Sequence, residues 1–315
     1  MKYHDNYTSA AKNLTKHRPK GNYMSQIYDA PRSTPSSKKP RLHLSFSGGR
    51  TSAFMSIWAK QHLAETHDLR FVFANTGAEH EDTLRFANEV DIRYGLGLVW
   101  VEAVVHPGQK KSSTHRVVTY KTASRMGEPF DAACQKYGLP NQVFKFCTRE
   151  LKVNPINSFI RTSGWAKGTY KTAIGIRSDE TRRVSKTADA QDILYPLVDL
   201  IPTDKQDVLE FFENFDWDLR IPEHQGNCVT CFKKSDRKLN TLYRENPRNF
   251  DFAIRLDSLY KNVGPNVVPG PRQMFRGHRS APDLVAEFIR NDADVSASVL
   301  DGGCSESCEL FDMAG

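Results

Sequence analysis

Residues 44–52, LSFSGGRTS, bring hydroxyl groups, two glycines and an arginine together between an apolar run and a segment with helical spacing. Gly48 and Gly49 allow a tight backbone turn and the close approach of a ligand. The N–H groups that open the following helix lie at the positive end of its dipole, and the guanidinium of Arg50 suits phosphate oxygens. The stretch therefore predicts a phosphate-binding loop, and a glycine turn before a Ser/Thr-rich helix cap is the simpler alternative. The residues expected to bind are Ser45, Ser47, Gly48, Gly49, Arg50, Thr51 and Ser52.

The cysteines form a second group with chemical potential. Cys228 and Cys231 make a CxxC pair, and Cys134 and Cys147 lie upstream. Six cysteines are too few for a disulfide framework in 315 residues, so a cluster of them indicates metal or redox chemistry. Thiolate ligands suit zinc or an iron–sulfur cluster, and plain buried thiols are the alternative. His224, four residues before Cys228, leaves a mixed zinc site open.

Two charged stretches fit a charged ligand. After Gly175, the segment GIRSDETRR carries Arg177, Arg182 and Arg183, which could bind an anion or belong to a solvated loop. Residues 109–125 hold five Lys/Arg and no acid. This basic stretch could clamp phosphates, hold a nucleic-acid backbone or be a solvated loop.

The elements that must position these residues follow from the apolar pattern. Helical spacing is found at residues 52–65, 81–95 and 204–215, the last with Asp204 as a good N-cap residue. Short apolar runs alternate with these helices, which predicts a doubly wound, mostly parallel α/β sheet covered on both faces. The five expected strands lie at residues 42–47, 69–76, 98–105, 169–176 and 193–198. In open sheets of this type, ligands bind beyond the carboxyl ends of the strands, where the loop at Gly48 lies.

Charge and composition divide the chain into three parts. Residues 1–41 carry nine Lys/Arg and two Asp, so the net charge of +7 resides in this arm and the remainder is balanced. We expect a disordered basic arm at residues 1–40, a nucleotide-binding α/β domain with the cysteine cluster at 41–232, and a helical appendage with an acidic tail at 233–315. The expected helices of the appendage are 236–247 and 281–292. No apolar run of about 18 residues and no signal-peptide stretch is found, which predicts a cytoplasmic protein without a membrane span.

Four stretches resemble known proteins. SFSGGRTSAFM resembles the PP-loop of the adenine-nucleotide alpha-hydrolase-like superfamily, whose usual form is SGGKDS. FANTGAEHEDTLRFANEV, KFCTRELKVNP and AIGIRSDETRR are similar, in order, to successive blocks of the phosphoadenosine phosphosulfate (PAPS) reductase-like family. The resemblance implies that ATP or PAPS is the nucleotide and that Asn75, Thr76 and Gly77 lie near its adenosine, with Gly175, Arg177, Arg182 and Arg183 as further nucleotide ligands. Thr51 stands where the usual motif has Asp, which puts Mg²⁺-assisted ATP cleavage in doubt.

The same resemblance bears on the cysteines. Relatives with such a set are similar to enzymes that hold a [4Fe–4S] cluster, which implies Cys134, Cys147, Cys228 and Cys231 as ligands, with zinc as the alternative. GGCSESCEL, with Cys304 and Cys308, partly resembles the catalytic C-terminal tail of sulfonucleotide reductases, although Glu309 replaces a Gly and the His is absent. The candidate catalytic residues are therefore Arg50, Arg177 and Cys308.

Three functions fit these residues. The first is an ATP-using sulfurtransferase that adenylates an acceptor, expected to be a nucleic acid, and takes sulfur from the cysteine site. The second is a PAPS or adenylylsulfate reductase that releases sulfite through Cys308 and relies on a thioredoxin-like protein. The third is a non-catalytic nucleotide- or cluster-binding module. A sulfur-donor protein would be a partner in the first case, and no stretch indicates an oligomeric state.

Overall fold

The computed structural model of the protein describes residues 39–264 and 270–290. Nearly all of the expected basic arm lies outside these residues, as does the acidic tail with Cys304 and Cys308. Within the described ranges, no helix is both long and apolar enough to span a bilayer.

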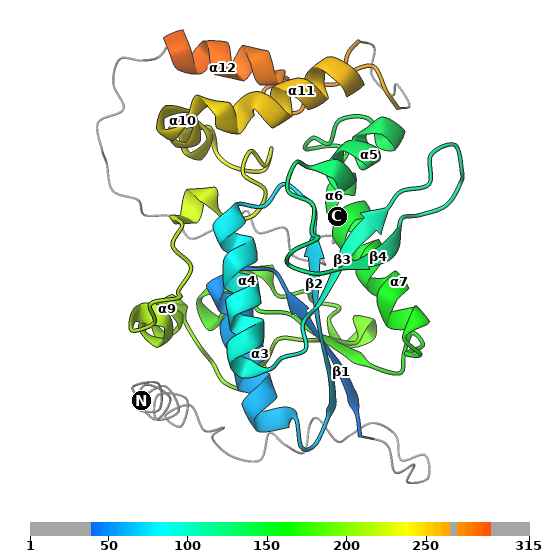
Figure 1. The fold of residues 1–315 in the computed structure, drawn as a ribbon, viewed down its shortest axis with the longest axis vertical. Coiled ribbons are helices and arrows are strands. Elements are labelled where there is room, and N and C mark those ends of the chain that lie inside the picture. Colours follow the sequence, from blue (N-terminus) through cyan, green and yellow to red (C-terminus); the bar gives the residue numbers. More distant parts are fainter. Residues whose placement is uncertain (1–38, 265–269, 291–315) are drawn as a thin grey trace.

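A six-stranded sheet forms the centre of the molecule (Figure 1). Its strand order is β4-β3-β2-β1-β5-β6. The chain builds outward from β1 to β3 and then returns to the other side of β1, so the order reverses between β1 and β5, where open sheets bind ligands. The strands are β1 (Arg41–Phe46), β2 (Asp68–Asn75), β3 (Val99–Val104), β4 (Thr114–Val118), β5 (Lys171–Ala173) and β6 (Ile193–Leu194).

The predicted fold class is confirmed, but the predicted number of strands is one too low. The additional strand is β4, which pairs antiparallel with β3 inside the basic stretch 109–125. Its sequence, THRVV, gives no clean apolar alternation because it is an edge strand in which no side chain is fully buried, and Val117 is 58% exposed. Charged residues on such an edge discourage pairing with other chains.

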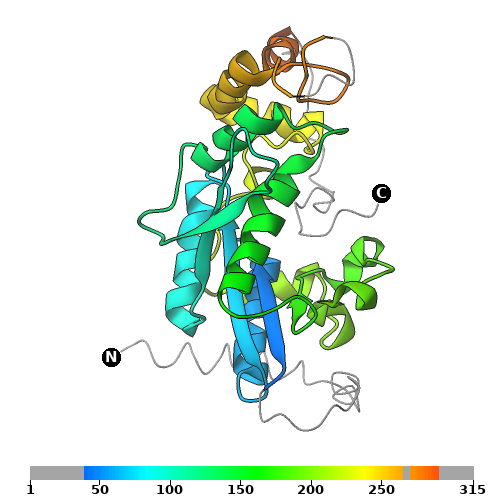
Figure 2. The same ribbon diagram turned by 90° about the vertical axis from the view of Figure 1, so that its right-hand side faces the viewer.

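Helices cover both faces of the sheet, and the alternation of side chains along β2 shows why. Phe71 and Phe73 pack with α3 (Arg50–Leu63), α4 (Glu81–Tyr94) and α9 (Lys205–Glu213). Val72 and Ala74 pack on the opposite side with α7 (Asn154–Thr162), which follows a π-helical turn at Arg149–Val153. Figure 2, turned by 90°, shows α7 on the face opposite to α3 and α4.

Helix starts agree with the capping chemistry of the sequence. Asp204 is the N-cap of α9 and forms a capping box with Asp207, as predicted. The α4 helix begins after His80, whose ring accepts a hydrogen bond from the N–H of Asp82, and ends at Gly95 in a left-handed conformation.

Three helices gather beyond the carboxyl ends of β1–β3 (Figure 1). They are α10 (Asp236–Glu245), α11 (Asp251–Tyr260) and α12 (Ala281–Arg290). The first and third agree with the predicted segments, and α11 was not among the predicted elements. These helices share one apolar cluster with α5 (Glu128–Tyr137) and with four cysteines. The remaining short helical elements are α6 (Phe146–Thr148), α8 (Pro196–Asp199), and the 3-10 turns Ser178–Arg183, Asp189–Gln191, Glu223–Gln225 and Pro247–Phe250.

Candidate functional site

A cavity of about 300 Å³ opens where the sheet order reverses. The loop after β1 forms one side of it and the segment after β5 forms another. Gly48 has a φ of +87°, and a Cβ at this position would lie 2.5 Å from Cγ2 of Thr83. Gly175 faces the loop, since a Cβ there would lie 3.2 Å from the Cα of Ser52. The sequence-predicted residues that line this phosphate-loop cavity are Ser47, Gly48, Gly49, Arg50, Thr51, Gly175, Arg177 and Arg183.

The start of α3 is open to an anion. Its N-cap, Gly49, provides no side-chain cap, and the first turn contains no acid. Ser52 shapes the loop from within: its Oγ accepts hydrogen bonds from the N–H and the hydroxyl of Ser47 at 3.1 and 3.0 Å. The backbone N–H groups and the helix dipole therefore favour a phosphate at this position. Ser45 is buried in β1 and does not line the cavity.

Arg50 has a protein partner. Its Nε and Nη2 donate to the two carboxylate oxygens of Asp218, with Nε–Oδ1 and Nη2–Oδ2 distances of 2.8 Å, and Nη2 also donates to the carbonyl of Leu219. The predicted phosphate ligand is thus fixed by a bidentate ion pair with a residue 168 positions away in the chain.

Two further cations of the cavity come from the segment after β5, and a third, Lys205, opens α9. Arg177 pairs with Asp179 and donates from Nη1 to Oγ1 of Thr51 at 3.2 Å. Glu180 bonds to Arg183 at 2.7 Å and lies 3.4 Å from Arg177. Arg182 is exposed and does not line the cavity. The lining includes Arg50, Arg177, Arg183 and Lys205 together with Glu180 and Glu223, and each of the four cations is paired with a carboxylate.

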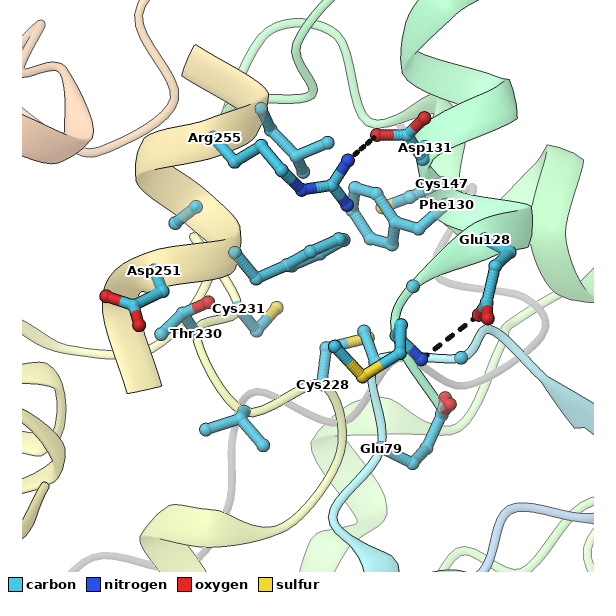
Figure 3. A pocket seen from close by; sticks show the side chains of 18 of the residues that line it. Glu79, Glu128, Phe130, Asp131, Cys147, Cys228, Thr230, Cys231, Asp251 and Arg255 are labelled. Carbon is cyan, nitrogen blue, oxygen red and sulfur yellow. Dashed lines mark hydrogen bonds and ion pairs between the residues drawn. The ribbon is translucent and has the colours of Figure 1, made fainter. Parts of the chain in front are cut away.

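A second cavity, of about 780 Å³, lies between α5, α11 and the loop that carries the CxxC pair (Figure 3). Cys147, Cys228 and Cys231 line it. In Figure 3 the side chains of Cys228 and Cys231 point into the cavity. Cys134 does not line it and is completely buried near Cys147. Burial raises the pKa of the Cys134 thiol, and the neighbouring Cys147 raises it further.

Three of the four predicted ligands line this cavity, and the fourth, Cys134, lies near Cys147. All four cysteines belong to one apolar cluster. Across the described residues, no group of three or more His, Cys, Asp or Glu side chains is arranged to hold a metal ion. His224 does not line the cavity, because its Nε2 lies 2.7 Å from Oε1 of Glu245.

The turn after β2 faces the cysteines rather than the phosphate loop. Asn75 donates to Oε1 of the buried Glu102 at 2.6 Å, and its own Oδ1 accepts from the N–H of Gly77 at 3.1 Å. The hydroxyl of Thr76 lies 3.5 Å from Sγ of Cys228. Gly77 lines the cysteine cavity, whereas none of Asn75, Thr76 and Gly77 lines the phosphate-loop cavity. The structure thus does not bring these residues together with the other expected nucleotide ligands.

The two cavities adjoin along one stretch of backbone. Gly226 and Asn227 line the phosphate-loop cavity, and the next residue, Cys228, lines the cysteine cavity. Cys228 forms a β-bridge with Glu79, and the N–H of Val229 donates to the carbonyl of Ala78 at 3.0 Å. The turn after β2 therefore fixes the backbone at the point where it passes from one cavity to the other.

Sequence reasoning missed two residues that organise the site. Asp218 lies in the segment after α9, where neither periodicity nor a motif distinguishes it. Glu102 is an acid inside a buried strand and accepts hydrogen bonds from Asn75, Arg116 and Ser124. A charged residue in the middle of the apolar run LVWVEAVV was the available signal, since charges are rarely buried without partners.

An open, mostly parallel sheet with a glycine loop and arginines at its switch point agrees with the PP-loop class that the motifs predicted. The model of the phosphoadenosine phosphosulfate reductase domain matches residues 41–194. An uncharacterised nin region protein, ORF290, of Escherichia phage lambda is 33% identical over 286 residues, covering 85% of this chain and 94% of the phage protein. The chain belongs to the PAPS reductase-like family, as its motifs predicted.

Two solved structures are also similar. A PAPS reductase from Candida auris, in a phosphate complex, has a TM-score of 0.34 and 15% identity, covering 68% of this chain and 87% of the reductase. The U34-tRNA thiolase NcsA from Methanococcus maripaludis, with its [4Fe–4S] cluster, has a TM-score of 0.37 and 12% identity, with 84% and 83% of the two chains covered.

Proposed function

We propose that the protein is an ATP-dependent sulfurtransferase whose acceptor is a nucleic acid. One observation carries the proposal: the arginine-lined phosphate-loop cavity and a cavity lined by three cysteines meet at Asn227 and Cys228. Sulfur transfer needs both parts, because an oxygen of the acceptor must become a leaving group before a sulfur nucleophile can replace it.

In the first step, the phosphate loop and Arg177 would hold the triphosphate of ATP. An acceptor oxygen attacks the α-phosphorus, the bond to the β-phosphate oxygen breaks, and pyrophosphate leaves. The positive end of α3 and the surrounding arginines stabilise the charge that develops on the phosphates. Thr51 accepts a hydrogen bond from Arg177, so arginine rather than a loop carboxylate neutralises charge at this position.

In the second step, sulfur from the cysteine cavity would displace AMP from the adenylated acceptor. Cys147, Cys228 and Cys231 fit an iron–sulfur site by donor chemistry, since three thiols line a space large enough for both a cofactor and an acceptor group. A bound [4Fe–4S] cluster would supply an iron position for inorganic sulfide. Cys134 does not line the cavity but lies near Cys147, and it is the candidate fourth ligand. Zinc on the same thiols is the alternative cofactor.

A nucleic-acid acceptor is supported by the basic stretch 109–125. Lys110, Lys111 and Lys121 are exposed, and Lys136 of α5 donates to the carbonyl of Lys111. Helix α5 also contributes Phe130 and Gln135 to the cysteine cavity, so exposed positive charge adjoins its wall. Such charge attracts a polyanion by release of its counterions.

A reductase is the second candidate, and the family match at residues 41–194 favours it. In that reaction a thiolate, for which Cys308 is the candidate, would attack the sulfur of PAPS and release the nucleotide, and a thioredoxin-like protein would then reduce the product and free sulfite. Cys308 lies outside the described residues.

Anaerobic purification followed by iron and sulfide counts tests the cofactor, and pyrophosphate release from ATP with total RNA or DNA tests the reaction. We expect iron to be lost in Cys147→Ser, Cys228→Ser and Cys231→Ser and retained in Cys304→Ser and Cys308→Ser. Cys134→Ser distinguishes four-thiol from three-thiol ligation. Sulfite release from PAPS that depends on Cys308, without pyrophosphate release from ATP, would establish the reductase instead.

A further inference from the structure

The bidentate pair of Arg50 and Asp218 leaves one part of the guanidinium available. Nε and Nη2 of Arg50 are both occupied by Asp218, and Nη2 also by the Leu219 carbonyl. Among the described residues, no acceptor is bonded to Nη1. Arg50 lines the phosphate-loop cavity, whereas Asp218 does not. The carboxylate thus holds Arg50 from outside the cavity without occupying the phosphate position.

Asp218 is itself held in place by the rest of the protein. The N–H of Leu219 donates to its Oδ1 at 2.6 Å. Arg85 of α4 donates to the carbonyls of Trp217 and Asp218 at 3.0 and 2.7 Å. Trp217 is buried in the main apolar cluster. Backbone and core contacts therefore hold the Asp218 carboxylate in place. A residue that orients another side chain, here Arg50, must itself be held in this way.

The two partners are both partly shielded from solvent. The side chains of Arg50 and Asp218 are 26% and 23% exposed. A planar guanidinium held by two parallel bonds loses its freedom to rotate before the ligand arrives, so less entropy is lost when a phosphate binds. The adjacent residue, Thr51, has no carboxylate that could hold the Arg50 guanidinium in place of Asp218.

We infer that Asp218 is a positioning residue that fixes Arg50 so that its Nη1 is presented to the phosphates of the bound nucleotide. The inference rests on the nucleotide site of the proposed function. It adds a residue that touches no ligand and determines how tightly the phosphates are held.

Asp218→Asn tests this inference, with affinity for ATP, for inorganic pyrophosphate and for adenosine measured by calorimetry. The amide keeps the shape of the carboxylate but presents N–H groups to a guanidinium that has no acceptor, so Arg50 should turn away. We expect affinity for ATP and pyrophosphate to fall roughly ten- to a hundredfold, the range of one charge-assisted contact. Affinity for adenosine, which has no phosphate, should not change. Asp216→Asn, an exposed neighbour two residues away, is the matched control and should behave as the parent.

A double-mutant cycle shows whether Asp218 acts through Arg50. In an Arg50→Ala background, Asp218→Asn should have no further effect on ATP affinity. Additive losses would overturn the inference, as would unchanged affinity in Asp218→Asn. An increase in ATP affinity would also overturn it, because Asp218 would then compete with phosphate for Arg50. Loss of adenosine binding together with ATP would indicate a general structural defect rather than positioning. All these measurements concern binding, so a protein that binds ATP but releases no pyrophosphate refutes the sulfurtransferase and leaves this inference standing.

Discussion

Replacing Gly48 by Ala should damage the phosphate loop, while the same change at the adjacent Gly49 should not. Gly48 has a φ of +87°, a conformation that residues with a side chain rarely adopt. The strain of holding Ala there is about 1–3 kcal/mol. The new Cβ would also lie 2.5 Å from Cγ2 of Thr83, a buried and β-branched residue with little freedom to rotate. Overpacking of this kind adds about 1–3 kcal/mol.

Gly49 provides the matched control. Its φ is −97°, and a Cβ there would have only Ser47 Oγ within reach, at 3.9 Å. Gly49→Ala should therefore change the free energy of unfolding by less than about 1 kcal/mol, because the unfolded chain loses entropy while Ala is a poorer N-cap than Gly. For Gly48→Ala we expect a loss of about 2–6 kcal/mol, the sum of the two costs above. Urea denaturation of both variants measures these values, and calorimetry with ATP measures the effect on the loop.

Thr83→Ala separates the two costs. The hydroxyl of Thr83 is buried and has no hydrogen-bond partner among residues 39–264 and 270–290, so its removal breaks no bond within them. In the double variant with Gly48→Ala, the overpacking cost should disappear and the backbone strain should stay. Equal stability of Gly48→Ala and Gly49→Ala, or no recovery in the double variant, would refute the geometry described for this loop.

Two further changes test other parts of the structure. Glu102→Gln should lower the free energy of unfolding by about 3–5 kcal/mol. The new amide would turn an N–H donor towards the donors of Asn75, Ser124 and Arg116. An unchanged denaturation midpoint would show that this network is dispensable. Removal of residues 1–38 should leave the melting temperature nearly unchanged, because a segment of Pro/Ser-rich, basic composition has little apolar surface to bury. A fall of more than a few degrees, seen by calorimetric scanning, would mean that the arm docks on the body.

Local rules determine the parts of the fold that the sequence predicted. Apolar runs of strand length separated by helical spacing identified β1, β2 and β3, because both faces of the sheet are covered and the pattern does not depend on distant contacts. The Asp204 cap and the glycine loop were predictable for the same reason. The edge strand β4 was not, since none of its side chains is fully buried and its pairing is set by β3.

The candidate site was only partly predictable because its arrangement depends on pairs distant in sequence. The resemblance to known motifs pointed to the loop at Gly48 and to Asn75, and their place beside a nucleotide stays a prediction. The bonds of Asn75 to Glu102 and Ser124 could not be read from the sequence. The partner of Arg50 is 168 residues away, and no local pattern encodes such a contact. The four cysteines did converge, as their residue type suggested, yet which of them reach the cavity depends on how α5 and α6 pack.

Asn227 and Cys228 connect the phosphate-loop cavity to the cysteine cavity through one stretch of backbone. Asn227 has a φ of +58°, a left-handed conformation that Asn tolerates better than most residues. Its neighbour Cys228 is held by the backbone of Glu79 and by the Thr76 hydroxyl. A nucleotide in the phosphate-loop cavity would contact the chain immediately before a cysteine that is fixed to β2 by the turn at Thr76. The strand β2 lies beside β1, and the phosphate loop follows β1. The phosphate loop and the turn that holds Cys228 are therefore attached to two neighbouring strands. In the proposed reaction, contacts to these two strands would thus help to set the distance between the nucleotide phosphates and the Cys228 thiol.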